Sequence, residues 1–147
     1  RRFEILHQSD SLTIVDDYGH HPAEIQATLE TAKTVWPNRR LVVVFQPHRF
    51  SRTQHLLESF YSSFNDADQL VLLDIYAAGE KSIEGIHSRK IAQGVREFGH
   101  KHVDLLESID SVIPHLKISL QPGDVVLTLG AGNIGELAHK LAAQFHD

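Results

Sequence analysis

The amino-acid sequence predicts an α/β fold in which helices cover both faces of a mostly parallel sheet, giving a three-layer sandwich. Two observations carry this prediction. Strand-like apolar runs alternate with segments of helical periodicity along the whole chain, as in folds built from strand–helix–strand units. The run at residues 41–45 has no polar interruption, which is typical of a parallel strand buried on both faces. Parallel strands need crossover connections, and the helical segments supply them.

The first half of the chain predicts three strands and two helices. The strands cover residues 3–7, 12–16 and 41–45. The first two are joined by a polar connection, residues 8–11, which is short enough for an antiparallel hairpin. One helix spans residues 23–36 and has a buried face formed by Ile25, Leu29, Ala32 and Trp36. A second helix follows the polar turn at residues 46–53 and buries Leu56, Leu57, Phe60, Tyr61 and Phe64.

The second half continues the same alternation. Its strands cover residues 69–73, 103–106 and 125–129, and residues 74–87 form a long loop. Ser88 is expected to cap a helix that carries Ile91, Val95 and Phe98. Ser108 is expected to cap a helix that contains Pro114 and is therefore kinked or short. The last helix buries Ile134, Leu137, Leu141 and Phe145.

Composition excludes several classes of function. The chain has 147 residues, enough for one domain with its own core, and it contains no cysteine, so neither a disulfide framework nor a thiolate metal site exists. A cytoplasmic setting fits this composition. The formal net charge is -5 and no block of basic residues occurs, so we expect no nucleic-acid partner. No apolar run approaches the ~20 residues of a membrane span, so we expect no membrane association. Because the first residue is Arg and Met is absent, we expect a piece of a longer protein.

A polar cluster follows the second predicted strand. Residues 16–22 have the sequence Asp-Asp-Tyr-Gly-His-His-Pro, which burial of apolar surface does not require. Pro22 suits the first position of a helix, so the cluster lies between a strand end and a helix N-terminus, where open α/β sheets bind ligands. Asp16 and Asp17 are neighbours on an extended strand and face opposite ways. We expect Asp17, which is nearer the turn, to face the cleft.

Two arginines follow the buried strand at residues 41–45. Arg49 and Arg52 stand three positions apart at the start of a predicted helix, so their guanidinium groups can converge on a carboxylate or a phosphate. The alternative is a pair of solvated surface arginines, and the position at a strand end favours the anion site. His20, His21 and His48 lie in the same two turns, but their spacing matches no known metal site, so we expect orienting roles and no metal.

A glycine-rich turn follows the last strand. Residues 130–135, Gly-Ala-Gly-Asn-Ile-Gly, match the dinucleotide-binding fingerprint, but the strand and acidic residue that this fingerprint needs further on are missing. We therefore expect no nucleotide cofactor here. The remaining alternatives are a purely structural turn and a turn whose backbone N–H groups, at Gly130, Gly132 and Asn133, face an anionic group.

These motifs together resemble the C-terminal domain of the Mur ligases. The matching stretches, in order, are residues 16–22, residues 45–49 with Arg52, residues 78–80 and residues 130–135. The resemblance covers residues 1–147 and is strongest to those members that join L-alanine to UDP-N-acetylmuramate in peptidoglycan biosynthesis. It implies a Rossmann-like α/β/α domain with a six-stranded sheet whose first strand is antiparallel.

The resemblance implies an ATP-dependent, three-domain ligase. An N-terminal domain would hold UDP-N-acetylmuramate, and a central domain would hold ATP and Mg²⁺; neither belongs to this chain, which also lacks a Gly-x-x-x-x-Gly-Lys-Ser/Thr loop. ATP would phosphorylate the muramoyl carboxylate, and the amine of L-alanine would attack the acyl phosphate. The domain by itself would hold no catalytic residue and be inactive, while closing over ATP in the whole enzyme.

The resemblance also assigns roles to residues. The carboxylate of L-alanine would be held by Arg49 and Arg52. The pocket would be lined and oriented by His48, His20 and Tyr18, and Asp17 would reach the ribose of ATP. Two alternatives stay open. One is the related recycling ligase that adds a whole tripeptide to the same sugar nucleotide, although the stretch from Gln46 to Arg52 favours L-alanine. The other is a non-catalytic nucleotide-binding or sensor module.

Overall fold

A computed structural model describes residues 1–145 and contains a six-stranded sheet in the order β1-β2-β6-β3-β4-β5. The strands are β1 (Glu4–Gln8), β2 (Leu12–Asp17), β3 (Leu41–Phe45), β4 (Gln69–Leu73), β5 (Val103–Leu106) and β6 (Asp124–Leu129). The hairpin β1–β2 is antiparallel, and all other neighbouring strands are parallel. The sheet therefore confirms the predicted fold class, including the antiparallel first strand.

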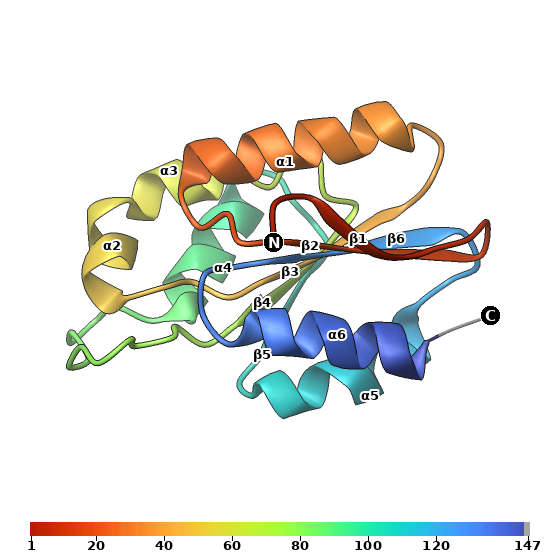
Figure 1. The fold of residues 1–147 in the computed structure, drawn as a ribbon. Helices are drawn as coiled ribbons and strands as arrows, with labels where there is room; N and C mark the ends of the chain where they lie inside the picture. The colour runs from red at the N-terminus through yellow and green to blue at the C-terminus, as the bar shows by residue number, and fades with distance from the viewer. Residues whose placement is uncertain (146–147) are drawn as a thin grey trace.

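Helices cover both faces of the sheet. They are α1 (Pro22–Val35), α2 (Phe50–His55), α3 (Leu57–Tyr61), α4 (Ser88–Glu97), α5 (Val112–Ser119) and α6 (Ile134–Gln144), with a 3₁₀ turn at Ile109–Ser111. Figure 1 shows α1 on one side of the strands and α5 and α6 on the other. Two apolar clusters result, one beneath α1, α3 and α4 and one beneath α5 and α6.

Strand β3 shows why an uninterrupted apolar run is needed at the centre of such a sheet. Val43 and Phe45 belong to the cluster beneath α1, whereas Val42 and Val44 belong to the opposite cluster. Alternate side chains of a strand point to opposite faces, so a strand covered on both sides must be apolar throughout. The ring of Phe45 packs against Phe60 and Phe64, with ring centroids 5.6 Å and 5.2 Å apart.

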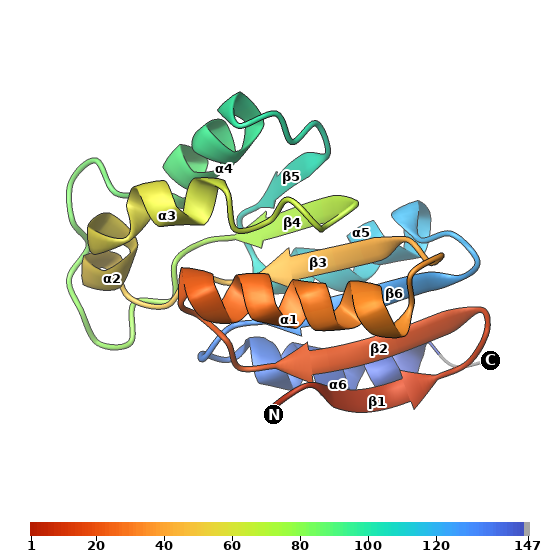
Figure 2. The same ribbon diagram turned by 90° about the horizontal axis from the view of Figure 1, so that it is seen from above.

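The register of the parallel strands brings several turns to one edge. Leu129 of β6 pairs with both Asp17 and Phe45, so the turns that follow β2, β3 and β6 begin side by side. Figure 2 shows the arrowheads of β2, β3 and β4 pointing towards the side on which α2 lies. The motifs singled out in the sequence therefore meet at the carboxyl edge of the sheet.

The predicted helix after residue 53 is wrong in its bounds. The segment begins at Phe50 and forms two short helices, α2 and α3, separated at Leu56, whose φ of -108° and ψ of 14° interrupt the helix. The apolar set stays on one side, because Phe60 and Phe64 are buried and Leu56 and Leu57 pack against them. Arg49 and Arg52 precede this break and follow closely after the end of β3.

Two predictions for α4 are also wrong. His87, not Ser88, is the N-cap residue, and its Nδ1 accepts a hydrogen bond from the amide of Arg89 at 3.1 Å. Ser88 is the first residue of the helix, and its hydroxyl donates to the carbonyl of Leu73 at 2.6 Å. Phe98 is 62% exposed and lies outside the core. Within residues 1–145, no helix is long and apolar enough to cross a bilayer.

Candidate functional site

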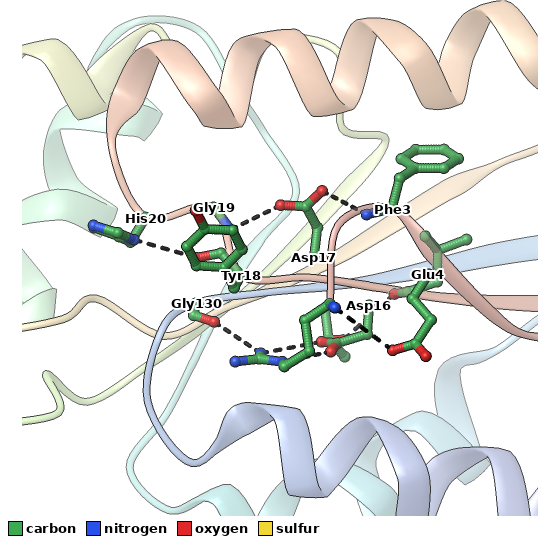
Figure 3. Close-up of polar contacts among 11 residues, drawn as sticks. Phe3, Glu4, Asp16, Asp17, Tyr18, Gly19, His20 and Gly130 are labelled. Atoms are coloured by element: carbon green, nitrogen blue, oxygen red, sulfur yellow. Dashed lines mark hydrogen bonds and ion pairs between the residues drawn. The ribbon is translucent and has the colours of Figure 1, made fainter.

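Asp16 and Asp17 end β2 and face opposite sides, as predicted. The carboxylate of Asp16 is fully buried and accepts hydrogen bonds from Arg1 Nε and Thr128 Oγ1, each at 2.7 Å. The same guanidinium donates through Nη2 to the carbonyl of Gly130 at 2.8 Å. Figure 3 shows this contact joining the N-terminal segment, the end of β2 and the glycine turn. Asp16 is therefore a structural anchor behind the site.

Asp17 lies at the strand end and is partly exposed. Its Oδ2 accepts from the amide of Phe3 and its Oδ1 from the amide of Gly19, both at 2.8 Å (Figure 3). These bonds fix the path of the turn that carries Tyr18 and His20. Each carboxylate oxygen keeps a second lone pair, so contact with the ribose of ATP stays a prediction.

The two histidines of this turn are held by a capping box at the start of α1. The Nδ1 of His21 accepts from the amide of Ala23 at 3.2 Å, and Glu24 Oε1 accepts from the amides of His21 and His20 at 3.1 Å and 3.3 Å. Burial would raise the pKa of Glu24, but these two amides hold it below its ordinary value. The sequence analysis missed Glu24, although a cap residue followed three positions later by Glu was the available signal.

Arg49 has an unusual backbone conformation. It lies at the N-cap of α2 with φ 76°, a region that costs a non-glycine residue about 1–3 kcal/mol and that is found at functional sites. Its amide donates to Tyr76 O and the amide of Tyr76 donates to Pro47 O, each at 2.8 Å, so the loop after β4 holds this conformation in place. The guanidinium of Arg49 is exposed and makes no hydrogen bond or close ion pair within residues 1–145, although its charge acts on the carboxylate of Glu80.

Arg52 is held one turn further along α2. Its Nη1 donates to His48 Nδ1 at 2.9 Å and to His48 O at 3.2 Å. Burial and the positive charge of Arg52 lower the pKa of His48 below its usual value. Both arginines line one open depression of about 670 Å³, and their convergence on an anion stays a prediction. The full lining is His20, His21, His48, Arg49, Ser51, Arg52, His55 and Leu56.

A row of rings borders this depression. The ring centroids of Tyr18 and His20 are 6.1 Å apart, those of His20 and His48 5.8 Å, and those of His48 and Tyr76 5.7 Å. Arg2 covers the outer end of the row, donating to the hydroxyl of Tyr18 at 2.7 Å. Three of the four rings were singled out from the sequence. Tyr76 was missed because nothing in the predicted loop 74–87 indicated that it returns to the site.

The loop after β4 is fastened to the start of α2. Glu80 accepts hydrogen bonds from the amide of Ser51, at 3.1 Å, and from its hydroxyl. These bonds lower the pKa of Glu80. Ala78 and Gly79 turn the loop with φ values of 52° and 86°. The Ala-Gly-Glu stretch thus brings Tyr76 and Glu80 against α2 and braces Arg49.

The glycine turn after β6 is packed closely by protein groups. A Cβ on Gly130, where φ is 149°, would lie 2.9 Å from Gln46 O, and one on Gly132 would lie 2.7 Å from the Tyr76 ring. Asn133 Oδ1 accepts from Gln46 Nε2 at 2.8 Å. This packing favours the structural alternative for the turn. An anion facing Gly130, Gly132 and Asn133 stays a prediction.

Comparison with known proteins identifies the family. The model described as "Mur ligase, glutamate ligase domain" matches residues 1–132. This chain belongs to the Mur ligase family. The match and the fold make it a Mur ligase C-terminal domain, in agreement with the resemblance inferred from the sequence motifs.

Two alanine ligases and a murein peptide ligase are similar to this Mur ligase domain. A UDP-N-acetylmuramate–L-alanine ligase from Geobacter sulfurreducens is 50% identical over 147 residues, which are 100% of this chain and 32% of the relative. The chain thus spans about a third of that protein's length. A solved UDP-N-acetylmuramate-alanine ligase from Thermotoga maritima superposes with a TM-score of 0.79 at 29% identity, over 98% of this chain and 29% of that one. A murein peptide ligase from Psychrobacter arcticus has a TM-score of 0.78 at 22% identity, over 98% of this chain and 29% of that one, and shares the fold.

Proposed function

We propose that this domain binds the amino-acid substrate of an ATP-dependent ligase that joins L-alanine to UDP-N-acetylmuramate in peptidoglycan biosynthesis. The observation that carries the proposal is the exposed guanidinium of Arg49, which makes no hydrogen bond or close ion pair within residues 1–145 and lines the same depression as Arg52. An exposed cation held by a strained backbone is suited to an anionic ligand. The 50% identity to the Geobacter alanine ligase supports L-alanine as that ligand.

The site would act by positioning. Arg49 and Arg52 would donate to the carboxylate of L-alanine, while His48, His20 and Tyr18 would line the pocket. In the whole enzyme, ATP would convert the muramoyl carboxylate into an acyl phosphate, and the held amine would attack it. Fixing two reactants in this way can lower a barrier by ~7–11 kcal/mol. Closure of the domain over ATP would also exclude water that would hydrolyse the acyl phosphate.

ATP would be shared with other parts of the protein. Asp17 would contact its ribose, and a central domain outside this chain would hold its phosphates. Among residues 1–145 no group of three or more His, Asp or Glu side chains is placed to hold a metal ion. By the family resemblance, we assign Mg²⁺ to the central domain, UDP-N-acetylmuramate to an N-terminal domain, and no activity to this domain alone. A cytoplasmic location fits these substrates.

The test is phosphate release by the full-length protein given ATP, Mg²⁺ and UDP-N-acetylmuramate. L-Alanine or the free tripeptide is added in parallel reactions. Release that depends on L-alanine is expected. Release with the tripeptide only would assign the protein to the recycling ligases, and release with neither would favour a non-catalytic binding module.

A further inference from the structure

The contacts of His48 determine which of its nitrogens carries hydrogen. Arg52 Nη1 lies 2.9 Å from His48 Nδ1, and a guanidinium can only donate hydrogen bonds. Nδ1 must therefore be an acceptor, which requires a neutral ring with its hydrogen on Nε2. The lowered pKa of His48 agrees with this state. His48 can donate to a ligand, but it cannot take up a proton without breaking its contact with Arg52.

The contacts of His20 place the hydrogen of its neutral ring on the other nitrogen, Nδ1. Its Nδ1 lies 3.2 Å from Tyr18 O, and a carbonyl oxygen can only accept, so Nδ1 carries hydrogen. The carboxylate of Glu24 lies behind the same nitrogen, 3.9 Å away, where it would stabilise an imidazolium. In the neutral ring Nε2 therefore holds a lone pair. Figure 3 shows this second nitrogen pointing away from the Tyr18 carbonyl. His20 has the arrangement of a general base whose other nitrogen is oriented by an acceptor.

We propose that Nε2 of His20 is the general base that deprotonates the ammonium group of the incoming amino acid. The inference rests on the proposed function, because an amino acid held by Arg49 and Arg52 would lie in the depression that His20 lines. An amino acid in neutral solution carries an ammonium group, which has no lone pair with which to attack an acyl phosphate. A base in the pocket would generate that lone pair from the predominant, protonated form of the amino acid.

The ammonium N–H bond breaks and its proton goes to His20 Nε2, giving an imidazolium and a neutral amine. The nitrogen lone pair forms a bond to the acyl carbon, the bond from that carbon to the phosphate oxygen breaks, and a second N–H proton leaves with the phosphate. The products are the amide, hydrogen phosphate and the imidazolium, which returns its proton to water.

The other groups around the depression are less suited to this role. His48 is committed to Arg52, and Nδ1 of His21 accepts the capping hydrogen bond from Ala23. The groups that face His20 are Tyr18 in its own turn, Glu24 on α1, His48 after β3, and the arginines of α2 across the depression. His20 thus lies between a carboxylate on α1 and the two arginines across the depression.

The experiment uses the full-length protein with His20→Gln, which cannot take up a proton, and His139→Gln, at an exposed position of α6 outside the depression, as the matched control. Amide formation with L-alanine is measured as a function of pH. The same enzymes are also given hydroxylamine, an amine that is largely unprotonated at neutral pH and traps the acyl phosphate without a base. Hydroxylamine therefore reports on acyl-phosphate formation and on folding.

We expect His20→Gln to lower the L-alanine rate roughly 10²–10⁴-fold at neutral pH, with hydroxylamine trapping within about twofold of wild type. The residual L-alanine rate should rise steadily with pH, since the variant depends on amine already deprotonated in solution. An equal loss with both nucleophiles, or no loss with either, would overturn the role of His20 alone. Failure of the wild-type protein to form hydroxamate would overturn the proposed function and this inference with it.

Discussion

Replacing Arg1 by methionine should destabilise the domain far more than its position at the start of the chain would suggest. The carboxylate of Asp16 is fully buried and has three side-chain contacts, two from Arg1, at 2.7 Å and 3.3 Å, and one from Thr128, at 2.7 Å. Without Arg1, one hydroxyl remains to support a buried charge. Breaking a buried pair costs about 3–5 kcal/mol, and because the Arg1 side chain is 30% exposed we expect about 2–3 kcal/mol.

Urea unfolding of the 147-residue chain measures this loss. Arg2→Met is the matched control, because the exposed Arg2 contacts the ring and hydroxyl of the half-buried Tyr18, and it should cost at most about 1 kcal/mol. Arg1→Met combined with Asp16→Asn removes the stranded charge and should recover more than about 1 kcal/mol relative to Arg1→Met alone. A loss below about 0.5 kcal/mol for Arg1→Met, or strict additivity in the double variant, would refute the anchoring role of this pair.

Two further predictions concern packing and pH. Gly94→Ala should lower the free energy of unfolding by about 1–3 kcal/mol, because the new Cβ would lie 2.1 Å from the Tyr61 ring. If the loss persists when Tyr61 is also truncated to Ala, this explanation is contradicted. The pKa of His48 is lower in the folded state than in the unfolded state, where a His side chain has a pKa of about 6.5. Between these two pKa values the folded state binds fewer protons. The free energy of unfolding should therefore fall as pH decreases through about 6.5 and on towards the folded-state pKa. His48→Asn, which cannot titrate, should flatten this part of a stability–pH curve measured by urea unfolding.

The arrangement of the sheet could be predicted because it depends on local patterns. The apolar run at residues 41–45 allows only a strand covered on both faces, and the observed strand has the same bounds. The placement of the turns that carry Asp17, Arg49 and Arg52 at one edge follows from parallel strands alone, although Asp17 does not line the depression of the arginines. These inferences need no knowledge of side-chain packing.

The missed features depend on contacts between distant segments. Arg1 forms an ion pair with the carboxylate of Asp16 near the buried end of β2, and no local sequence pattern predicts this contact. Ser88 and His87 can both cap a helix, and the choice was made by a hydrogen bond from Ser88 to Leu73 in another element. Tyr76 is held at the site by backbone hydrogen bonds to the turn at residues 47–49. The amino-acid composition of its loop does not predict these bonds. The tertiary structure decides such cases.

The central claim is that the depression beside α2 holds the amino-acid carboxylate through Arg49. The most direct test is the KM for L-alanine and the KM for ATP of full-length Arg49→Ala, measured by phosphate release. Loss of charge-assisted hydrogen bonds worth about 1.5–3 kcal/mol should raise the KM for L-alanine by roughly 10–150-fold and leave the KM for ATP nearly unchanged. Equal increases in both constants, or none in the KM for L-alanine, would contradict the claim.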